Sequence, residues 1–402
     1  MPTPQLPPEL LRDIFDTFIL SYPSHAIRIS NLYSLSLVNR TFHQIANPLL
    51  YRNLFLDTSR RQKIISTLST KGSLAREVRA ITIIGGEMSV DEFELIKAVL
   101  SRCDNSSSFT YLCFDPWYLP SLTAFVAKTW STTLRYLRSD QKEGLYDLLC
   151  RLPHLEELVA SCIDFPPSLT PSSSRSLSPS PSPSLATSLS PPNPVSFPVP
   201  TFRLKRFDSG SSPYSHNFEA LTFTSRSSLT TLDLPVSSRS PIQDLSLFPS
   251  LASLTLTLSE RYIPHDLDAR PVGVGRSERD DMRCLQRVKE TLKRVGGDSL
   301  KWLEVYQPDY KRTRAFAKED VEKADLLEGI PESVKELDLS TIEVGEEPLS
   351  RSFRETEGDE GGEQKVRGKG LKKIVLRQTE RAKEVEECLK KLAIEVRWVC
   401  ST

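Results

Sequence analysis

Residues 229–234, LTTLDL, and residues 251–256, LASLTL, show one short pattern, with apolar residues at the first, fourth and sixth positions. Successive side chains of a β-strand point to opposite faces, so the fourth and sixth positions lie on the same face. The pattern therefore predicts short strands that bury one face. The residues between the apolar positions are expected on the opposite face.

The pattern returns along the chain, with starts 21 to 49 residues apart, in VRAITI at 78, FTYLCF at 109, LRYL at 134, LEELVA at 155, LKRF at 204, LKWLEV at 300, VKELDL at 334 and LKKIVL at 371. Helical spacing appears between strands, for example in VDEFELIKAVLSRC at 90–103 and YDLLCRLP at 146–153. Alternating strands and helices predict an α/β fold with parallel strands. The recurring strand motif favours an irregular solenoid similar to leucine-rich repeats, and a conventional α/β sheet is the alternative.

Three stretches interrupt the pattern, and we expect low-complexity insertions at 166–200, 262–283 and 345–370. The first is rich in Ser and Pro, so burial cannot offset its ordering entropy and it is expected to be disordered. Its Ser-Pro dipeptides are either targets of proline-directed kinases or parts of a tolerated surface loop. The second has a Gly273-x-Gly275 pair but lacks the third glycine of a dinucleotide-binding loop.

Composition restricts the class of partner. The chain has 52 Lys plus Arg and 52 Asp plus Glu, so no overall basic charge favours nucleic acid or an anionic membrane. Seven cysteines without CxxC spacing argue against a disulfide framework and a zinc site. The sequence shows neither a signal-peptide pattern nor a run of about 18 apolar residues. We therefore expect an intracellular protein, in the cytoplasm, the nucleus or both, with a protein partner.

The sequence contains no HExxH, P-loop or GxSxG motif, and its five histidines stand far apart. We therefore predict no catalytic residue, no cofactor and no metal site. A cysteine nucleophile whose partners converge only in the fold stays an alternative.

The N-terminal stretch LPPELLRDIFDTF, residues 6–18, has the apolar spacing of a helix. The stretch NLYSLSLVNRTFHQIANPLLYRNLFL, residues 31–56, continues a helical pattern, and Asn47-Pro48 is expected to break it. These short helices carry more apolar residues than they can bury among themselves. One apolar face must therefore meet another part of the chain or another protein.

These two stretches together resemble an F-box, in the form common in fungal proteins that ends in LLYR, over roughly residues 4–56. F-boxes are three-helix modules that dock on the Skp-family adaptor of cullin-RING ubiquitin ligases. The resemblance implies adaptor binding by Leu6, Pro7, Leu10, Ile14, Leu37, Val38 and Phe42. The segment from Ser21 to Ser30 is longer than the usual linker, and Asn39 stands where a cysteine often follows the valine. An N-terminal helical cap on the next domain is the alternative.

The resemblance divides the chain into an F-box at residues 1–60 and a repeat domain at residues 61–402. It implies a non-catalytic substrate-recognition subunit of a Skp-cullin-F-box ubiquitin ligase. The partners would be the adaptor, through it a cullin, and a protein substrate held by the repeats for ubiquitin-dependent degradation. A non-degradative interaction scaffold is the second hypothesis, and an enzyme such as a hydrolase is the third.

The outward residues of the predicted strands are the candidates for substrate binding. We select Tyr136, Trp302, Glu304, Tyr306 and Asp338. The same face is predicted to include Tyr111, Asp115, Arg138, Glu157, Arg206, Asp208, Asp233, Glu336, Lys373 and Arg377. Aromatic residues rimmed by charge are typical interface anchors, which favours the LKWLEVYQP stretch at 300–308. In the alternative interpretation, Trp302 packs under the adjoining insertion at 306–325.

Overall fold

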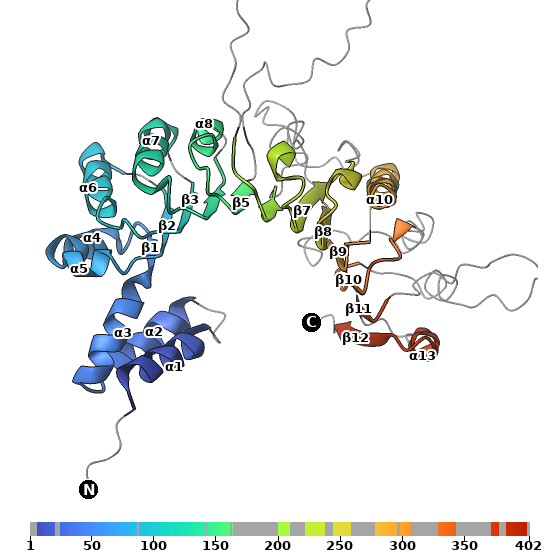
Figure 1. Ribbon diagram of the computed structural model, residues 1–402, viewed down its shortest axis with the longest axis horizontal. Coiled ribbons are helices and arrows are strands. Elements are labelled where there is room, and N and C mark those ends of the chain that lie inside the picture. The colour runs from blue at the N-terminus through green and yellow to red at the C-terminus, as the bar shows by residue number, and fades with distance from the viewer. Residues whose placement is uncertain are drawn as a thin grey trace, which may run out of the picture. The chain divides into compact units, whose positions relative to one another are not determined.

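A computed structural model of the chain describes residues 6–20, 25–86, 88–113, 115–141, 143–160, 163, 200–209, 222–237, 244–258, 278–295, 298–306, 329–342, 371–377 and 383–399 (Figure 1). The chain divides into two compact units, residues 1–156 with 200–202 and residues 157–199 with 203–402. The three predicted insertions lie largely outside the described residues. Helix α10 (Glu278–Lys293) begins within the second of them.

The first unit begins with three helices, α1 (Pro8–Leu20), α2 (His25–Ser36) and α3 (Arg40–Arg52). They share a core of Phe15, Leu32, Ala46 and Leu49, each at most 6% exposed. The ring of Phe15 packs edge-on against Phe42, with 5.1 Å between ring centroids. The helical N-terminal region predicted from the sequence is therefore confirmed.

The predicted helix break at Asn47-Pro48 is wrong, because Pro48 lies inside α3. Proline in a helix interior removes one backbone hydrogen bond and costs about 3 kcal/mol. Ala46 and Leu49, on either side of this site, are both buried in the three-helix core. Their burial holds the helix together, and α3 continues directly into the first strand, β1 (Asn53–Leu56).

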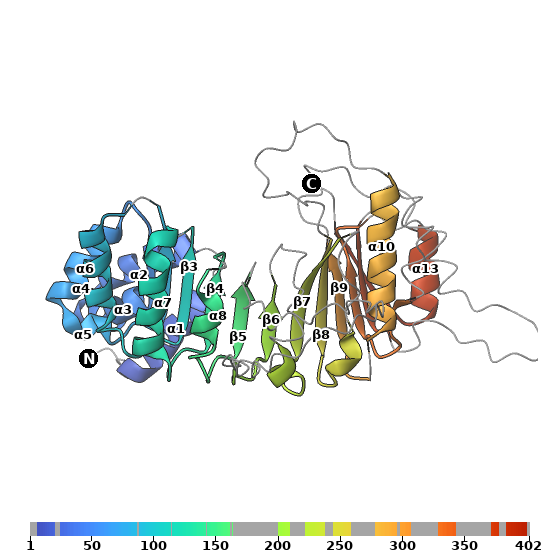
Figure 2. The same ribbon diagram turned by 90° about the horizontal axis from the view of Figure 1, so that it is seen from above.

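The rest of the first unit alternates strands and helices. The parallel strands β1, β2 (Ala80–Ile84), β3 (Ser108–Leu112) and β4 (Tyr136–Ser139) pair in sequence order. The connecting segments contain α4 (Arg61–Thr70), α5 (Gly72–Ala75), α6 (Val90–Leu100), the 3-10 turn η1 (Pro116–Tyr118), α7 (Leu119–Trp130) and α8 (Leu145–Leu149). Helices α6, α7 and α8 lie on the same side of the strands (Figure 1 and Figure 2).

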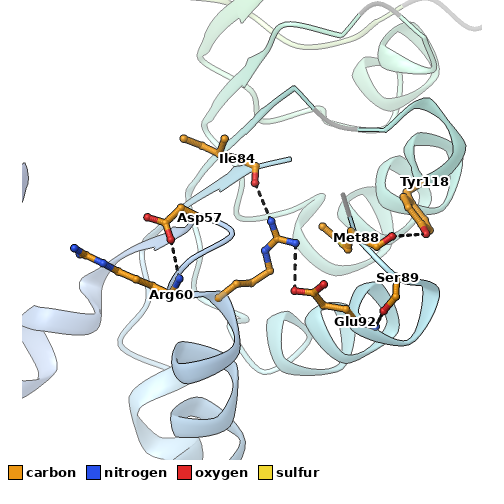
Figure 3. A network of polar contacts seen from close by, with 8 residues as sticks. Asp57, Arg60, Ile84, Met88, Ser89, Glu92 and Tyr118 are labelled. Atoms are coloured by element: carbon orange, nitrogen blue, oxygen red, sulfur yellow. Dashed lines mark hydrogen bonds and ion pairs between the residues drawn. The ribbon is translucent and has the colours of Figure 1, made fainter. Parts of the chain in front are cut away.

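A buried arginine joins three elements of the first unit. The Arg61 guanidinium, 1% exposed, donates to the Glu92 carboxylate over 3.3 Å and to the Ile84 carbonyl over 3.2 Å. Figure 3 shows the surrounding contacts, in which the Ser89 hydroxyl caps α6 by accepting from the Glu92 amide. An unpaired buried charge is costly, so this ion pair fixes α4 against β2 and α6.

The second unit contains strands β5 (Glu157–Ala160), β6 (Arg206–Asp208), β7 (Thr231–Val236), β8 (Ser253–Leu258), β9 (Trp302–Tyr306), β10 (Glu336–Leu339), β11 (Lys373–Arg377) and β12 (Glu395–Val399). Each strand from β5 to β11 pairs in parallel with the next one in sequence. Between strands lie the 3-10 turns η3 (Phe223–Ser225) and η4 (Leu245–Leu247) and the helices α10 and α13 (Lys383–Lys391). The predicted parallel sheet is confirmed.

The apolar positions of nine of the ten pattern occurrences are buried, including Leu229, Leu232 and Leu234 of the first stretch quoted above. The pattern therefore places the buried face of the sheet correctly along most of the chain. The residues between these positions face outward, on the side of the second unit opposite α10 and α13 (Figure 1).

The exception is FTYLCF at 109–114, where the prediction that Tyr111 faces outward is wrong. Phe109 and Tyr111 are both fully buried, and so is Ser106, three residues before Phe109. The pattern thus begins at Ser106. Because serine is polar, a search for apolar residues does not find this starting position. A shift by an odd number of residues moves every side chain to the opposite face of a strand.

Candidate functional site

An exposed apolar surface lies on α1 and α2, on the residue Leu6 just before α1, and on the turn between α2 and α3. It contains large apolar side chains that are 47% to 67% exposed, namely Leu6, Leu10, Ile14, Ile27, Tyr33, Leu37 and Val38. We call these residues the helical apolar surface. Single exposed apolar residues are ordinary, but seven within one short helical region are typical of an interaction site.

The sequence of α1 places part of this surface. Pro8 is the first residue of α1, a position where its missing N–H group costs nothing. Leu10 and Ile14 are four residues apart and therefore lie on the same face of the helix. Phe15 points into the core, so the exposed and buried faces of α1 carry different apolar residues.

The turn between α2 and α3 positions a second part of the helical apolar surface. Leu37 and Val38 lie in this turn, and their amides donate to carbonyls of the last turn of α2. The side chain of Asn39 then caps α3 by accepting a 2.8 Å hydrogen bond from the amide of Phe42. Asn39 is therefore a helix cap, which gives a physical reason for this departure from the common F-box pattern.

Contacts beneath the surface hold α1 in place. Phe42 is half-buried against Phe15, so it supports the surface from below. Arg52 at the end of α3 pairs with Asp16 of α1 at 3.0 Å. Of the seven residues predicted to bind an adaptor, Phe42 thus lies beneath the surface and the other six are exposed.

Comparison with known proteins supports the resemblance of the N-terminal helices to an F-box. A family model described as F-box-like matches residues 3–57, the segment that contains α1 to α3 and β1. Residues 3–57 thus form an F-box-like domain, which supports the prediction that this is an F-box protein. The comparison with curated proteins gave no match. Among the described residues, none of the helices has the length and apolar character needed to cross a membrane.

A second candidate surface lies on the outward face of the second unit. The strand register places Asp208 beside Asp233, Asp233 beside Thr255, Thr255 beside Glu304, and Glu304 beside Asp338. We call Asp208, Asp233, Glu304 and Asp338 the carboxylate row. Neighbouring strands are about 4.8 Å apart, so the row extends over about 19 Å.

Partial burial and repulsion between neighbouring carboxylates raise the pKa of two members of this row, Asp233 and Glu304. Burial, then the nearby Asp208, raises the pKa of Asp233 to about 6, while the Thr257 hydroxyl opposes the shift by donating over 2.9 Å. Burial and the nearby Asp338 likewise raise the pKa of Glu304. The carboxylates of the row therefore repel one another, and Arg206 on β6 offsets part of that repulsion at Asp233.

Two aromatic residues flank the row on β9. Trp302 is half-buried and Tyr306 is 37% exposed, and both lie on the same face of the strand as Glu304. In the neighbouring row of paired strand residues, Glu336 of β10 lies next to Trp302 of β9. The Glu336 carboxylate pairs with the Lys373 ammonium at 3.4 Å. The expected placement of Trp302, Glu304 and Tyr306 on one face thus agrees with the strand geometry.

The structure assigns the other candidates differently. Tyr136 lies on β4, which belongs to the first unit. The proposed cover of Trp302 by residues 306–325 falls almost entirely outside the described residues. Sequence reasoning missed Thr255 and Thr257, which share this face. An alignment of the repeated strands would have found Thr255, because the fifth position of the pattern reads Asp, Thr, Glu and Asp in LTTLDL, LASLTL, LKWLEV and VKELDL. Thr257 lies two residues further along the same strand, and therefore on the same face.

Proposed function

We propose that this protein is the substrate-recognition subunit of a Skp-cullin-F-box ubiquitin ligase. The helical apolar surface docks on a Skp-family adaptor, and the adaptor connects the chain to a cullin. Residues 61–402 form an irregular leucine-rich-repeat solenoid that holds a protein substrate. The protein works within the cell, in the cytoplasm, the nucleus or both.

The observation that carries this proposal is the exposed apolar surface on a domain that matches an F-box-like family model. Full burial of one Leu, Ile or Val side chain contributes about 1.5 to 3 kcal/mol. Leu10, Ile14 and Leu37 are each about half exposed or more, so each retains roughly 1 kcal/mol of burial to gain from a partner. Docking on an adaptor supplies that burial.

In this proposal the protein promotes ubiquitin transfer only by bringing the substrate close to the enzyme that carries ubiquitin. A substrate held on the repeats lies at high local concentration relative to a ubiquitin-carrying enzyme on the same assembly. No side chain of this chain then forms or breaks a covalent bond. The role agrees with the usual role of F-box domains as adaptor modules.

Co-expression with a Skp-family adaptor tests the proposal. The full chain should co-purify with the adaptor, and a Leu10→Asp, Ile14→Asp variant should lose capture. Two charges buried at a docking face without partners cost several kcal/mol in total, on the order of 10³-fold in affinity. Circular dichroism should show that the variant keeps the wild-type fold.

Leu95→Asp is the matched control. Leu95 is 49% exposed, close to the exposure of Leu10 and Ile14, but it lies on α6 outside the F-box-like domain. This variant should capture the adaptor as well as the wild type. If the wild-type chain fails to bind, or if the double variant binds as well as the control, the adaptor role is wrong and the scaffold hypothesis replaces it.

A further inference from the structure

We infer that the outward sheet face of the second unit binds a segment of protein rich in arginine or lysine. The inference rests on the proposed function, because it names the chemistry of the substrate that the repeats would hold. The docking face is defined as strands β6 to β10 with Trp302, Tyr306 and the carboxylate row.

The face is a continuous parallel sheet without a described helix over it. Helix α10 lies on the other side, where it packs against β7, and α13 lies on that side beside β12 (Figure 1). The outward residues from β6 to β10 are partly or fully accessible, apart from Pro235 at the end of β7. The face therefore offers side chains, and not backbone groups, to a partner.

Charge complementarity determines the kind of partner. Four of the five neighbouring positions Asp208, Asp233, Thr255, Glu304 and Asp338 are carboxylates in one register row. Burial and, after it, repulsion from Asp208 raise the pKa of Asp233, and a partner with cations at matching intervals would relieve this repulsion. Cationic side chains bind carboxylates through charge-assisted hydrogen bonds, and arginine does so with two parallel bonds.

The aromatic pair favours a peptide cation over a simple ion. Trp302 and Tyr306 stand on either side of Glu304 along β9, so a cation bound at Glu304 meets an aromatic side chain in each direction. Guanidinium and ammonium groups are attracted to the faces of Trp and Tyr rings. Among the described residues, no group of three or more His, Cys, Asp or Glu side chains is placed to hold a metal ion.

The length of the row sets the length of the bound segment. An extended chain advances about 3.3 Å per residue, so about six residues match the span of about 19 Å. The probe for a binding test is therefore a fluorescent peptide of about eight residues that alternates arginine with alanine. A peptide of equal length with glutamine in place of arginine is the neutral control.

Fluorescence anisotropy with the full chain tests the inference. The arginine peptide should bind and the glutamine peptide should not. A variant with Asp233→Asn, Glu304→Gln and Asp338→Asn should bind about tenfold more weakly, a loss of about 1.4 kcal/mol that three ion pairs of about 0.5 kcal/mol each would account for. Trp302→Ala should weaken binding by roughly two- to fivefold through loss of the cation–π contact.

A second triple variant controls for net charge. Asp91→Asn, Glu94→Gln and Glu387→Gln change the charge equally but lie on exposed positions of α6 and α13. This variant should bind the arginine peptide as the wild type does. The inference is overturned if the wild type does not bind the peptide, if the first triple variant binds normally, or if both triple variants lose the same affinity.

Adaptor capture by the same proteins separates this inference from the proposed function. Both triple variants should capture the Skp-family adaptor, because their changes lie outside the helical apolar surface. Peptide binding without adaptor capture would support the docking face and reject the ligase role. Adaptor capture without peptide binding would leave the ligase role in place and reject a cationic substrate.

Discussion

Asp233 on β7 should destabilise the fold at neutral pH, and Asp233→Asn should remove the effect. Burial and the neighbouring Asp208 raise its pKa from the ordinary 3.8 to about 6. The folded state then binds a proton more readily than the unfolded state. Lowering the pH from 6 towards 4 therefore removes the destabilisation that comes from Asp233, and above pH 6 the full cost of its ionisation is present.

The magnitude follows from the shift. A difference of about two pKa units corresponds to about 3 kcal/mol, which is an upper limit for a fully buried group. Asp233 keeps partial contact with water, so screening reduces the cost to roughly 1 to 2 kcal/mol. Asparagine retains the acceptor for the Thr257 hydroxyl and removes only the charge.

Urea unfolding measured at several pH values tests the prediction. Asp233→Asn should raise the unfolding midpoint at pH 7.5, and the gain should shrink as the pH falls through 6 and vanish near 4. Asp91→Asn, at an exposed position of α6, should show no such gain. A variant that is no more stable than the wild type at pH 7.5, or a gain that does not depend on pH, would refute the reasoning.

Three further predictions concern the first unit and are measured by thermal or urea unfolding. Asn39→Ala should lower stability by about 1 kcal/mol through loss of the α3 cap, while Asn39→Ser should retain most of it. Phe15→Ala should cost about 3 to 5 kcal/mol because it opens a cavity beside Phe42, and an effect below 1 kcal/mol would contradict the packing. Glu92→Ala should cost about 3 kcal/mol by leaving the Arg61 charge buried without its carboxylate, whereas the double change with Arg61→Met should recover much of this loss.

The strand pattern made most of the parallel sheet predictable. Stretches such as LKWLEV fix which side chains are buried, because strand side chains alternate strictly. Tyr111 shows the limit, since a buried Ser106 at the start of the pattern displaced the assignment by three residues. Strand β1 was missed because its residues directly follow a helix and were assigned to the same helical segment.

The candidate sites were predictable in part. The spacing of Leu10 and Ile14 indicates an exposed helix face, whereas the support from Phe42 and the Arg52–Asp16 pair depends on how helices pack. Trp302 and Tyr306 were expected on one strand face because they are four residues apart in a strand. Their position beside a row of carboxylates depends on the register between strands, which a single strand pattern does not contain.

The most direct test of the ligase role is hydrogen–deuterium exchange of the full chain with and without a purified Skp-family adaptor. Docking should slow exchange in α1, in α2 and in the turn at Leu37 and Val38, and leave strands β6 to β10 unchanged. This pattern would place the adaptor on the helical apolar surface. Unchanged exchange in the three N-terminal helices, or protection confined to the second unit, would contradict the account.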